Sequence, residues 1–481
     1  MNATLTPLGA TLLELEELSD GAVMNVGGVM VFDPPPEGGV PTVEEVQALV
    51  DDRLSGLHGY RQRLSRTRTG SWSWPQWIDD ERFDIANHVT RAALPSPGGD
   101  AELCEWIAEF YSHRLDRTRP LWEVVLLEGL QDGRWALAHK LHHSLIGETG
   151  SVGAAELLLD AGPGPVTEAP PVRPPVASES LWRSLVPVAP RPVVQAVRAG
   201  GHVMASGLHA TLRPRQTLAR SRMLAELLIE DEIVGAPRCS LNVATGPTRR
   251  YAAVRRPLSD LTAISNALGG PVTDVALAAC TAGLRRLLLA RDENLPPGGL
   301  RAMFPLNLRD AAGTTPVGFR FVALPVAEPA TVVRHQRLLE ATRRQGGSHA
   351  WEATGTLVDL ATLTPPLVHA SLARLLYGTR LFNLTIANVR GAQRPRYALG
   401  SRLREVHPIT PLAAEHAVGI TIFTQDGLTI FGLSADRESM PDLAVLADGI
   451  EEGIEDLLQS VHENHRGRQG AHPPARTPTH T

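Results

Sequence analysis

The amino-acid sequence predicts a mixed α/β fold built from two halves. Segments with apolar residues at alternate positions, typical of half-buried strands, are interspersed with segments whose apolar residues recur every three or four positions, as in helices. Residues 161–178 are rich in Pro and Gly, lack apolar periodicity and separate the two halves. With 481 residues, 43% of them hydrophobic and 20% charged, the chain is long enough for two or three domains.

Each half contains both kinds of element. In the first half, the patterns predict strands over residues 26–32, 122–127 and 135–143, and helices over residues 43–57 and 101–115. In the second half, they predict helices over residues 258–268 and 273–289, and strands over residues 302–308, 319–326, 382–389 and 417–424.

The Pro- and Gly-rich segment sets the boundaries of the predicted parts. We predict an N-terminal subdomain over residues 1–160, a linker with a basic helical crossover over residues 161–235, and a C-terminal subdomain over residues 236–462. Residues 463–481, rich in His, Pro, Arg and Gly, are predicted to form a disordered tail.

Composition narrows the location and the partners. The three cysteines are scattered and residues 1–13 lack the pattern of a signal peptide, so we expect a reducing, cytoplasmic location. The longest apolar runs, such as residues 272–284, are interrupted by Asp274 or are shorter than the roughly 20 residues that a spanning helix needs. The net charge of −6 gives no basis for a nucleic-acid partner.

Residues 181–223 combine basic and apolar side chains and contain no acidic residue. This composition fits a peripheral element on anionic lipid at the inner face of the plasma membrane. It fits equally a bridging helix that shows its arginines to solvent. The arginines are Arg183, Arg191, Arg198, Arg213, Arg215, Arg220 and Arg222.

A second feature is a group of three tryptophans, Trp72, Trp74 and Trp77. They predict a packed aromatic cluster, with contact to an acyl chain as the alternative.

A pair of histidines, His142 and His143, follows an apolar stretch in the run HKLHHSLIGE at residues 139–148. Alternation places His143 on the same face as Leu141 and the apolar side chains before it. An imidazole in such a setting, with an unperturbed pKa of about 6.5, can be held neutral and can accept a proton from an alcohol. The residues alone also allow a second interpretation, in which both histidines are ordinary strand residues.

Metal binding is a further interpretation of the same run. His139 and His143 are four residues apart and would share one face of a helix, as paired zinc ligands do. However, no Glu follows His139, Lys140 would lie beside the cation, and the three cysteines are too scattered to complete a site. We therefore expect no metal.

Seven ordered and widely spaced motifs extend the picture to the whole chain. They are NVGGVMVFD at 25–33, FD at 83–84 with HV at 88–89, LDRTRPLWE at 115–123, GPTRR at 246–250, GGPVTDV at 269–275, RAMFP at 301–305 and NLTIANVRG at 383–391. Over roughly residues 5–460 the chain resembles the bacterial wax ester synthase/diacylglycerol acyltransferases.

The resemblance implies two chloramphenicol-acetyltransferase-like subdomains joined by a helical crossover, with the active site in a tunnel between them. It implies acyl-CoA as co-substrate, no cofactor, and a hydroxylated lipid or alcohol as acceptor, met at a membrane or lipid-droplet surface. In the family pattern His-His-x-x-x-Asp-Gly the second histidine is the base, which carries over to His143 beside His142. Asp274 and Asn388 lie in the second-half motifs and are the candidate supporting residues. No Cys or Ser of the motif is flanked as an activated nucleophile, so we expect direct transfer in a ternary complex.

The histidine motif departs from the family pattern at two positions. Gly147 stands where the family has Asp, and Glu148 where it has Gly. In related acyltransferases this Asp orders the loop rather than transferring protons, so its loss should cost rigidity more than basicity. Glu148 could replace it if its side chain turned inward.

Two functions are therefore compatible with the sequence. An intact His143 favours an acyl-CoA-dependent O-acyltransferase. Gly147, and Phe319 at a position where the family often has Asn after Gly, favour a non-catalytic descendant that binds acyl-CoA or lipid or scaffolds an active relative.

Overall fold

The structure is a computed structural model that describes most of both halves. It covers residues 3–5, 7–19, 21–36, 38–54, 56–65, 75–145, 153–164, 235–307, 317–346, 381–412 and 415–470. Several predictions fall outside these ranges: those for Trp72, Trp74, Gly147 and Glu148, for linker residues 165–178, and for the basic segment at residues 181–223.

In the described residues, the first half is built on a six-stranded sheet with the order β12-β13-β2-β7-β6-β5. Its strands are β2 (Asn25–Phe32), β5 (Val89–Ala93), β6 (Trp122–Glu128), β7 (Trp135–His142), β12 (Tyr397–Ala398) and β13 (Ser401–Ile409). Its helices are α1 (Pro7–Leu18), α2 (Val43–Leu54), α3 (Asp100–Ser112) and α5 (Gly153–Leu157). A small sheet of β1 (Ala3–Thr4), β4 (Gln76–Asp79) and β3 (Gln62–Leu64) lies beside it. Short 3₁₀ turns are η1 (His58–Arg61), η2 (Ile85–Asn87), η3 (Gln131–Gly133) and η4 (His143–Leu145).

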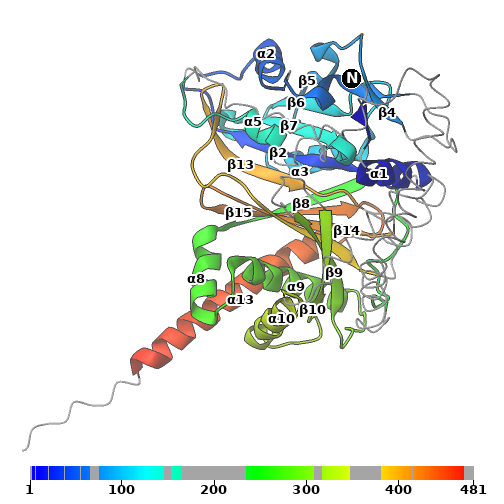
Figure 1. Ribbon diagram of the computed structural model, residues 1–481. Coiled ribbons are helices and arrows are strands. Elements are labelled where there is room, and N and C mark those ends of the chain that lie inside the picture. Colours follow the sequence, from blue (N-terminus) through cyan, green and yellow to red (C-terminus); the bar gives the residue numbers. More distant parts are fainter. Residues whose placement is uncertain are drawn as a thin grey trace, which may run out of the picture.

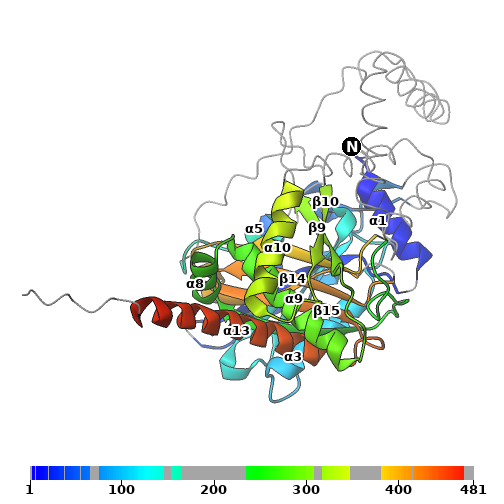
Figure 2. The ribbon, with the colours of Figure 1, turned by 90° about the horizontal axis from the view of Figure 1, so that it is seen from below.

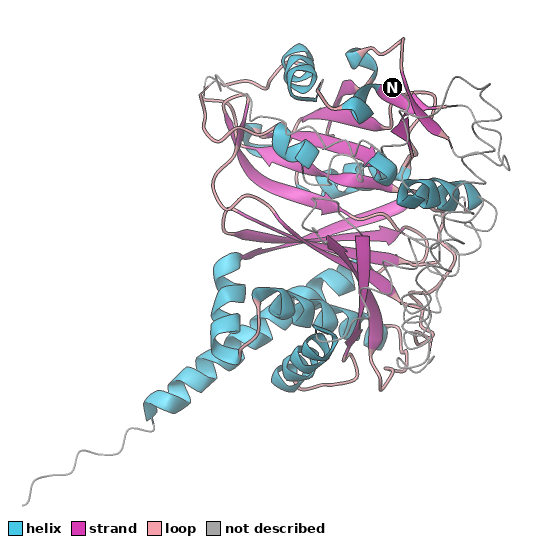
Figure 3. Ribbon diagram, in the orientation of Figure 1, coloured by secondary structure: helices cyan, strands magenta, loops and turns pink. Residues whose placement is uncertain are grey.

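The second half is a six-stranded sheet with the order β10-β9-β11-β14-β15-β8, again counting described residues. The strands are β8 (Arg249–Pro257), β9 (Leu300–Asn307), β10 (Val317–Leu324), β11 (Leu384–Arg390), β14 (Val418–Gln425) and β15 (Leu428–Asp436). Helices α8 (Leu258–Leu268), α9 (Val272–Ala290), α10 (Thr331–Gly346) and α13 (Leu443–Gly470) lie on the side of this sheet that faces away from the first half (Figures 1 and 3). Seen from below, α13 runs across the view at a steep angle to α10, with α9 beside it (Figure 2).

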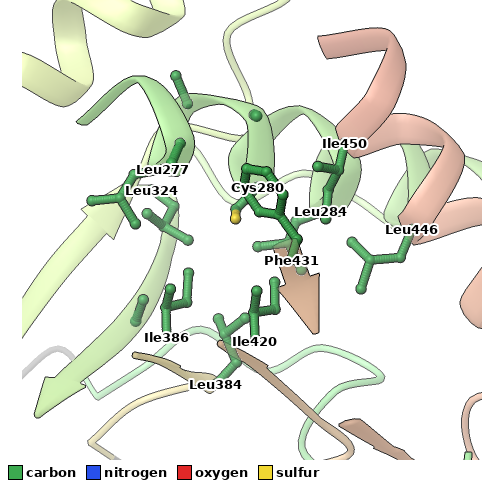
Figure 4. Packing of buried hydrophobic residues seen from close by; sticks show 14 of the residues in the cluster. Leu277, Cys280, Leu284, Leu324, Leu384, Ile386, Ile420, Phe431, Leu446 and Ile450 are labelled. Atoms are coloured by element: carbon green, nitrogen blue, oxygen red, sulfur yellow. The ribbon is translucent and has the colours of Figure 1, made fainter. Parts of the chain in front are cut away.

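The core of the second half lies between its sheet and the helices (Figure 4). Cys280 and Leu284 on α9 lie between Phe431 of the sheet and Ile450 on α13, and these side chains are buried. α9 and α13 pack closely because Gly283 of α9 faces Gly449 of α13. A Cβ added to Gly283 would lie 2.7 Å from Ile450 Cγ1. This contact fixes α9, whose N-terminus carries Thr273 and Asp274.

The predicted elements correspond to observed ones, with differences at their ends. The helix predicted over residues 258–268 is α8, with the same bounds. The strand predicted over residues 135–143 is β7, but it ends at His142 because His143 begins the turn η4. The sequence patterns did not reveal α1, α10, α13, β8, β13 and β15, all of which are present.

Strand β13 joins the two halves. It comes from the second half of the sequence, but it pairs antiparallel with β2 of the first sheet, with Val406 opposite Met30. Across the halves, Arg255 of β8 donates to Glu405 of β13 at 2.6 Å and to Asp100 of α3 at 2.9 Å. The predicted C-terminal subdomain, residues 236–462, therefore contributes a strand to the first sheet, and the predicted domain boundaries remain a prediction.

The end of the described chain corrects one expectation. Helix α13 runs from Leu443 to Gly470, so disorder from residue 463 onward is wrong for residues 463–470. The buried part of the helix, with Ile450, Ile454 and Leu457 in the core, provides the nucleus, and each further residue extends a helix that already exists. Residues 471–481 lie outside the described chain.

Within the described residues, no single helix combines the length and the apolar composition needed to cross a membrane. The pair α8 and α9 meets this requirement together by length and composition only, with a bend of 101° between them.

Candidate active site

The histidine pair lies at the end of a buried central strand. β7 runs between β2 and β6, and all eight of its residues are buried. The predicted alternation is present: Trp135, Leu137 and Leu141 pack in one cluster, and Ala136 and Ala138 in another. The sheet therefore holds the last residue of the strand, and the turn that follows it, in a fixed place.

His143 opens this turn and is anchored through its backbone. Its N–H donates to the carbonyl oxygen of Met24 at 2.8 Å, one residue beyond the β7–β2 pairing of His142 with Asn25. The residue as a whole is half-buried, with Nδ1 buried, whereas His139 is 2% exposed. Burial, together with the nearby His142, lowers the pKa of His143 to about 4, so the imidazole is neutral at physiological pH. A neutral imidazole is the form that accepts a proton.

His142 is held by hydrogen bonds at Nδ1 and is 1% exposed. Nδ1 accepts the backbone N–H of Ser144 at 3.1 Å and lies 2.7 Å from the Ser144 hydroxyl. Nε2 lies 3.6 Å from Oε2 of Glu16, an ion-pair distance that is longer than a hydrogen bond. Burial lowers the pKa of His142, and Glu16 opposes this shift. These contacts place the His142 ring against the turn η4, and the catalytic roles of His142 and His143 remain predictions.

Glu16 reaches this turn from α1 and is 1% exposed. Its Oε1 accepts the backbone N–H of Met24 at 3.0 Å, and its Oε2 accepts from Arg117 at 2.8 Å. Burial by itself would raise the pKa of Glu16, but His142 and Arg117 lower it to about 2. A buried carboxylate is thus kept ionised by partners from two other parts of the chain.

The first-half motifs meet on β6, the neighbour of β7. The backbone N–H of His142 donates to Leu121 of the PLW segment at 3.0 Å. His88 stacks on Trp122 with 4.5 Å between ring centroids, and its Nδ1 lies 2.9 Å from the Trp122 carbonyl oxygen. Phe83 stacks on His88 in turn. These separate motifs therefore form one buried support for the histidine pair.

Other residues of the histidine run and of the tryptophan segment are structural. Lys140 is 2% exposed, forms an ion pair with Glu123 at 2.9 Å, and lies 4.1 Å from the ring centroid of Phe110. Trp77 is fully buried in the first-half core, which agrees with a packed aromatic residue. In the portion of the chain that the structure describes, no group of three His, Cys, Asp or Glu residues could hold a metal ion.

The histidine pair lies near the boundary between the halves. Asn25, opposite His142 in the sheet, lines a cavity of about 20 Å³ together with residues of the second half such as Tyr251 and Ser434. Arg249, in the GPTRR motif, donates to Gly21 in the loop before β2 at 2.5 Å. Burial lowers the pKa of Arg249 to about 10. The second half therefore holds the loop that leads into Met24 and Asn25.

The predicted supporting residues make their hydrogen bonds within the second half. Asp274 is 7% exposed and accepts from the Thr342 hydroxyl at 2.9 Å; burial raises its pKa, and Thr342 opposes the shift. Asn388 donates to the Thr273 hydroxyl at 2.9 Å and so ties β11 to the start of α9. A role for Asp274 and Asn388 beside His143 remains a prediction.

Sequence patterns did not identify Glu16, Met24 or Ser144 as parts of this site. The signal for Glu16 was an acid within the apolar helical stretch LLELEEL at residues 12–18, because a carboxylate on the buried side of a helix needs a partner. Nothing in the sequence distinguishes Glu16 from Glu14 or Glu17, which its helix also carries.

Family models and named relatives match most of this chain. Residues 5–276 match the wax ester synthase/diacylglycerol acyltransferase catalytic domain, and residues 315–458 match the WS/DGAT C-terminal domain. A protein of Mycobacterium tuberculosis named probable diacylglycerol O-acyltransferase is 30% identical over 469 residues, covering 94% of this chain and 95% of the relative.

Two solved structures resemble this chain over almost its whole length. The wax ester synthase/diacylglycerol acyltransferase from Marinobacter aquaeolei VT8 has a TM-score of 0.68 and 26% identity, covering 96% of this chain and all of that chain. A trichothecene 15-O-acetyltransferase from Fusarium sporotrichioides, at 11% identity and a TM-score of 0.57, covers 95% of this chain and 94% of its own and shares the fold alone. The predicted mixed α/β, chloramphenicol-acetyltransferase-like fold is confirmed.

Proposed function

Because the chain belongs to the wax ester synthase/diacylglycerol acyltransferase family of acyltransferases, we propose that it transfers an acyl group from acyl-CoA to a hydroxyl acceptor with His143 as general base. The observation that carries this proposal is the neutral imidazole of the half-buried residue His143, which follows β7 and is anchored to Met24 through its backbone N–H. The acceptor class is diacylglycerol, a long-chain alcohol or a specialised alcohol.

The reaction needs one proton acceptor and one proton return. The His143 imidazole takes the proton of the acceptor hydroxyl while the oxygen attacks the thioester carbonyl carbon. The tetrahedral intermediate collapses, the C–S bond breaks, and the imidazolium gives its proton to the leaving thiolate, so an ester and free CoA form. No acyl-enzyme is involved, and the two substrates meet in a ternary complex.

The low pKa of His143 suits this role in one respect. At neutral pH nearly all His143 side chains are unprotonated, so very little of the enzyme is in the wrong protonation state. The return of the proton is favoured for the same reason, because an imidazolium in a buried setting is a strong acid. Acyl-CoA is the only co-substrate in this scheme, and a membrane or lipid-droplet surface would supply a lipid acceptor.

The second candidate is a non-catalytic protein that binds acyl-CoA or lipid, and Gly147 at the position of the motif Asp favours it. One experiment separates the two. Purified full-length protein is incubated with palmitoyl-CoA and a panel of acceptors: dioleoylglycerol, hexadecanol, shorter alcohols and sterols. Thiol release and ester formation are followed together. Acceptor-dependent release of CoA with matching ester supports the acyltransferase, whereas palmitoyl-CoA binding without release with any acceptor contradicts it.

A further inference from the structure

A buried carboxylate that lies outside the histidine motif, Glu16, contacts both Met24 and His142. We propose that Glu16 of α1 is a positioning residue for the reaction, acting through Met24 and His142 on His143. The proposal rests on the proposed function, because positioning has a kinetic meaning only if His143 is the base. It also predicts a structural effect that can be measured without any activity.

The first step runs through Met24. Glu16 Oε1 accepts the Met24 N–H at 3.0 Å, and the carbonyl oxygen of the same residue accepts the N–H of His143 at 2.8 Å. The carboxylate and the base thus bind the two polar backbone groups of one residue. A shift of Met24 moves His143, and displacements of about 1 Å at a reacting group can cost about 100-fold in rate.

The second step runs through the ring of His142. Nδ1 accepts the Ser144 N–H at 3.1 Å, so the neutral ring carries its hydrogen on Nε2, toward Glu16. Ser144 belongs to η4, the turn that His143 begins. Fixing the His142 ring therefore fixes the backbone on the C-terminal side of the base, while Met24 fixes it on the β2 side.

The third step concerns the burial of the Glu16 carboxylate. Glu16 is 1% exposed, and Arg117 supplies the compensating positive charge at 2.8 Å. Buried charges of this kind are costly unless paired, and their value is often to specify one arrangement. From α1, Glu16 contacts Met24, His142 of β7 and Arg117 of the 115–123 motif at one point, which suits a positioning role better than a role in bulk stability.

Helix α1 supplies a matched control. Glu17 is the next residue, binds the same Arg117, and has a side chain that is 45% exposed. Glu17 forms an ion pair with Arg117, whereas Met24 and His142 contact Glu16. Glu17→Gln therefore removes one carboxylate charge from the same helix and the same arginine without touching the path to His143.

The kinetic test compares full-length Glu16→Gln and Glu17→Gln in CoA release, at a temperature well below both melting temperatures. We expect Glu16→Gln to lower kcat by about 10- to 100-fold with KM for palmitoyl-CoA within about two-fold, and Glu17→Gln to match the wild type. In a double-mutant cycle, His142→Gln should cost less in the Glu16→Gln background than in the wild type, because Glu16→Gln already weakens the route through His142. Unchanged kcat in Glu16→Gln, or fully additive losses, would overturn the proposal.

The structural test uses nitrogen NMR of histidine-labelled protein, with the His142 and His143 signals identified by their loss in His142→Gln and His143→Gln. We expect Glu16→Gln to shift or broaden both signals and Glu17→Gln to leave them in place. If they stay unchanged in Glu16→Gln, the positioning proposal is wrong. If the wild type and Glu17→Gln release no CoA with any acceptor while the signals respond as expected, the proposed function fails and the positioning of the pair by Glu16 stands.

Discussion

Lys140 of β7 and Glu123 of β6 stand directly opposite each other in the first sheet, with 2.9 Å between Nζ and Oε2. Lys140 is the only lysine in the sequence. Its side chain is 2% exposed, whereas that of Glu123 is 38% exposed. Lys140 also donates to the carbonyl oxygens of Phe110 and His113 on and after α3. The pair thus ties the strand that carries the histidines to its neighbour and to a helix.

Because Lys140 is buried and Glu123 is partly exposed, we expect the loss of either partner to lower the free energy of unfolding by a different amount. Glu123→Gln leaves a buried ammonium without its carboxylate, and we expect it to lower the free energy of unfolding by about 1–3 kcal/mol. Lys140→Met leaves a carboxylate that water can reach, and we expect the smaller loss. Urea denaturation of both variants measures the difference. A larger loss in Lys140→Met would show that packing and carbonyl contacts of Lys140, rather than the charge pair, dominate.

The pKa of His143 predicts the acid side of the rate profile. Burial and His142 lower this pKa to about 4, and a general base works only while unprotonated. Activity is therefore retained as pH falls through 6.5, the ordinary histidine value, and is lost as pH approaches 4. CoA release measured from pH 4 to 8, with a thiol reagent that reacts in acid, gives kcat/KM at each pH. An acid limb centred near 6.5 would show that His143 is not held in a buried setting.

The altered motif predicts a gain of activity on restoration. The double change Gly147→Asp with Glu148→Gly recreates the family pattern, in which the Asp orders the loop. We expect higher turnover on long-chain alcohols or diacylglycerol, measured as CoA release. If the variant is less stable and no more active, the pocket has adapted to Gly147 and Glu148, which would favour a specialised acceptor or a binding role.

The basic segment predicts electrostatic binding to membranes. Changing Arg213, Arg215, Arg220 and Arg222 to Gln should reduce sedimentation with anionic phosphatidylglycerol vesicles, and added salt should weaken the binding of the wild type. Neutral phosphatidylcholine vesicles serve as the control. Equal binding to both kinds of vesicle at all salt concentrations would leave a bridging segment as the better interpretation.

Local patterns predicted those elements whose own residues determine them. β2, β6 and β7 alternate or run apolar over seven or eight residues, so their positions followed from a period of two, within one residue of the observed bounds. The place of β13 did not follow, because it depends on pairing with β2 across more than 370 positions of sequence, as between Val406 and Met30. No local pattern carries that information.

The residues of the candidate site also differ in whether local sequence could predict them. His143 could be predicted because its chemistry and its motif are local. Glu16 could not, because its burial and ionisation depend on Arg117 and His142, each more than 100 residues away. Partners this distant act only once the chain has folded, and an acidic residue in a helix is ordinarily solvated.

The central claim is that His143 is the base, and His143→Ala in the full-length protein tests it most directly. The control is His113→Ala, because His113 has a side chain that is 67% exposed and lies just after α3. With palmitoyl-CoA and the best acceptor of the panel, we expect His143→Ala to lower acceptor-dependent CoA release by at least about 100-fold, with a melting temperature close to that of the wild type, and His113→Ala to retain activity. A folded His143→Ala protein that releases CoA at the wild-type rate would contradict the assignment.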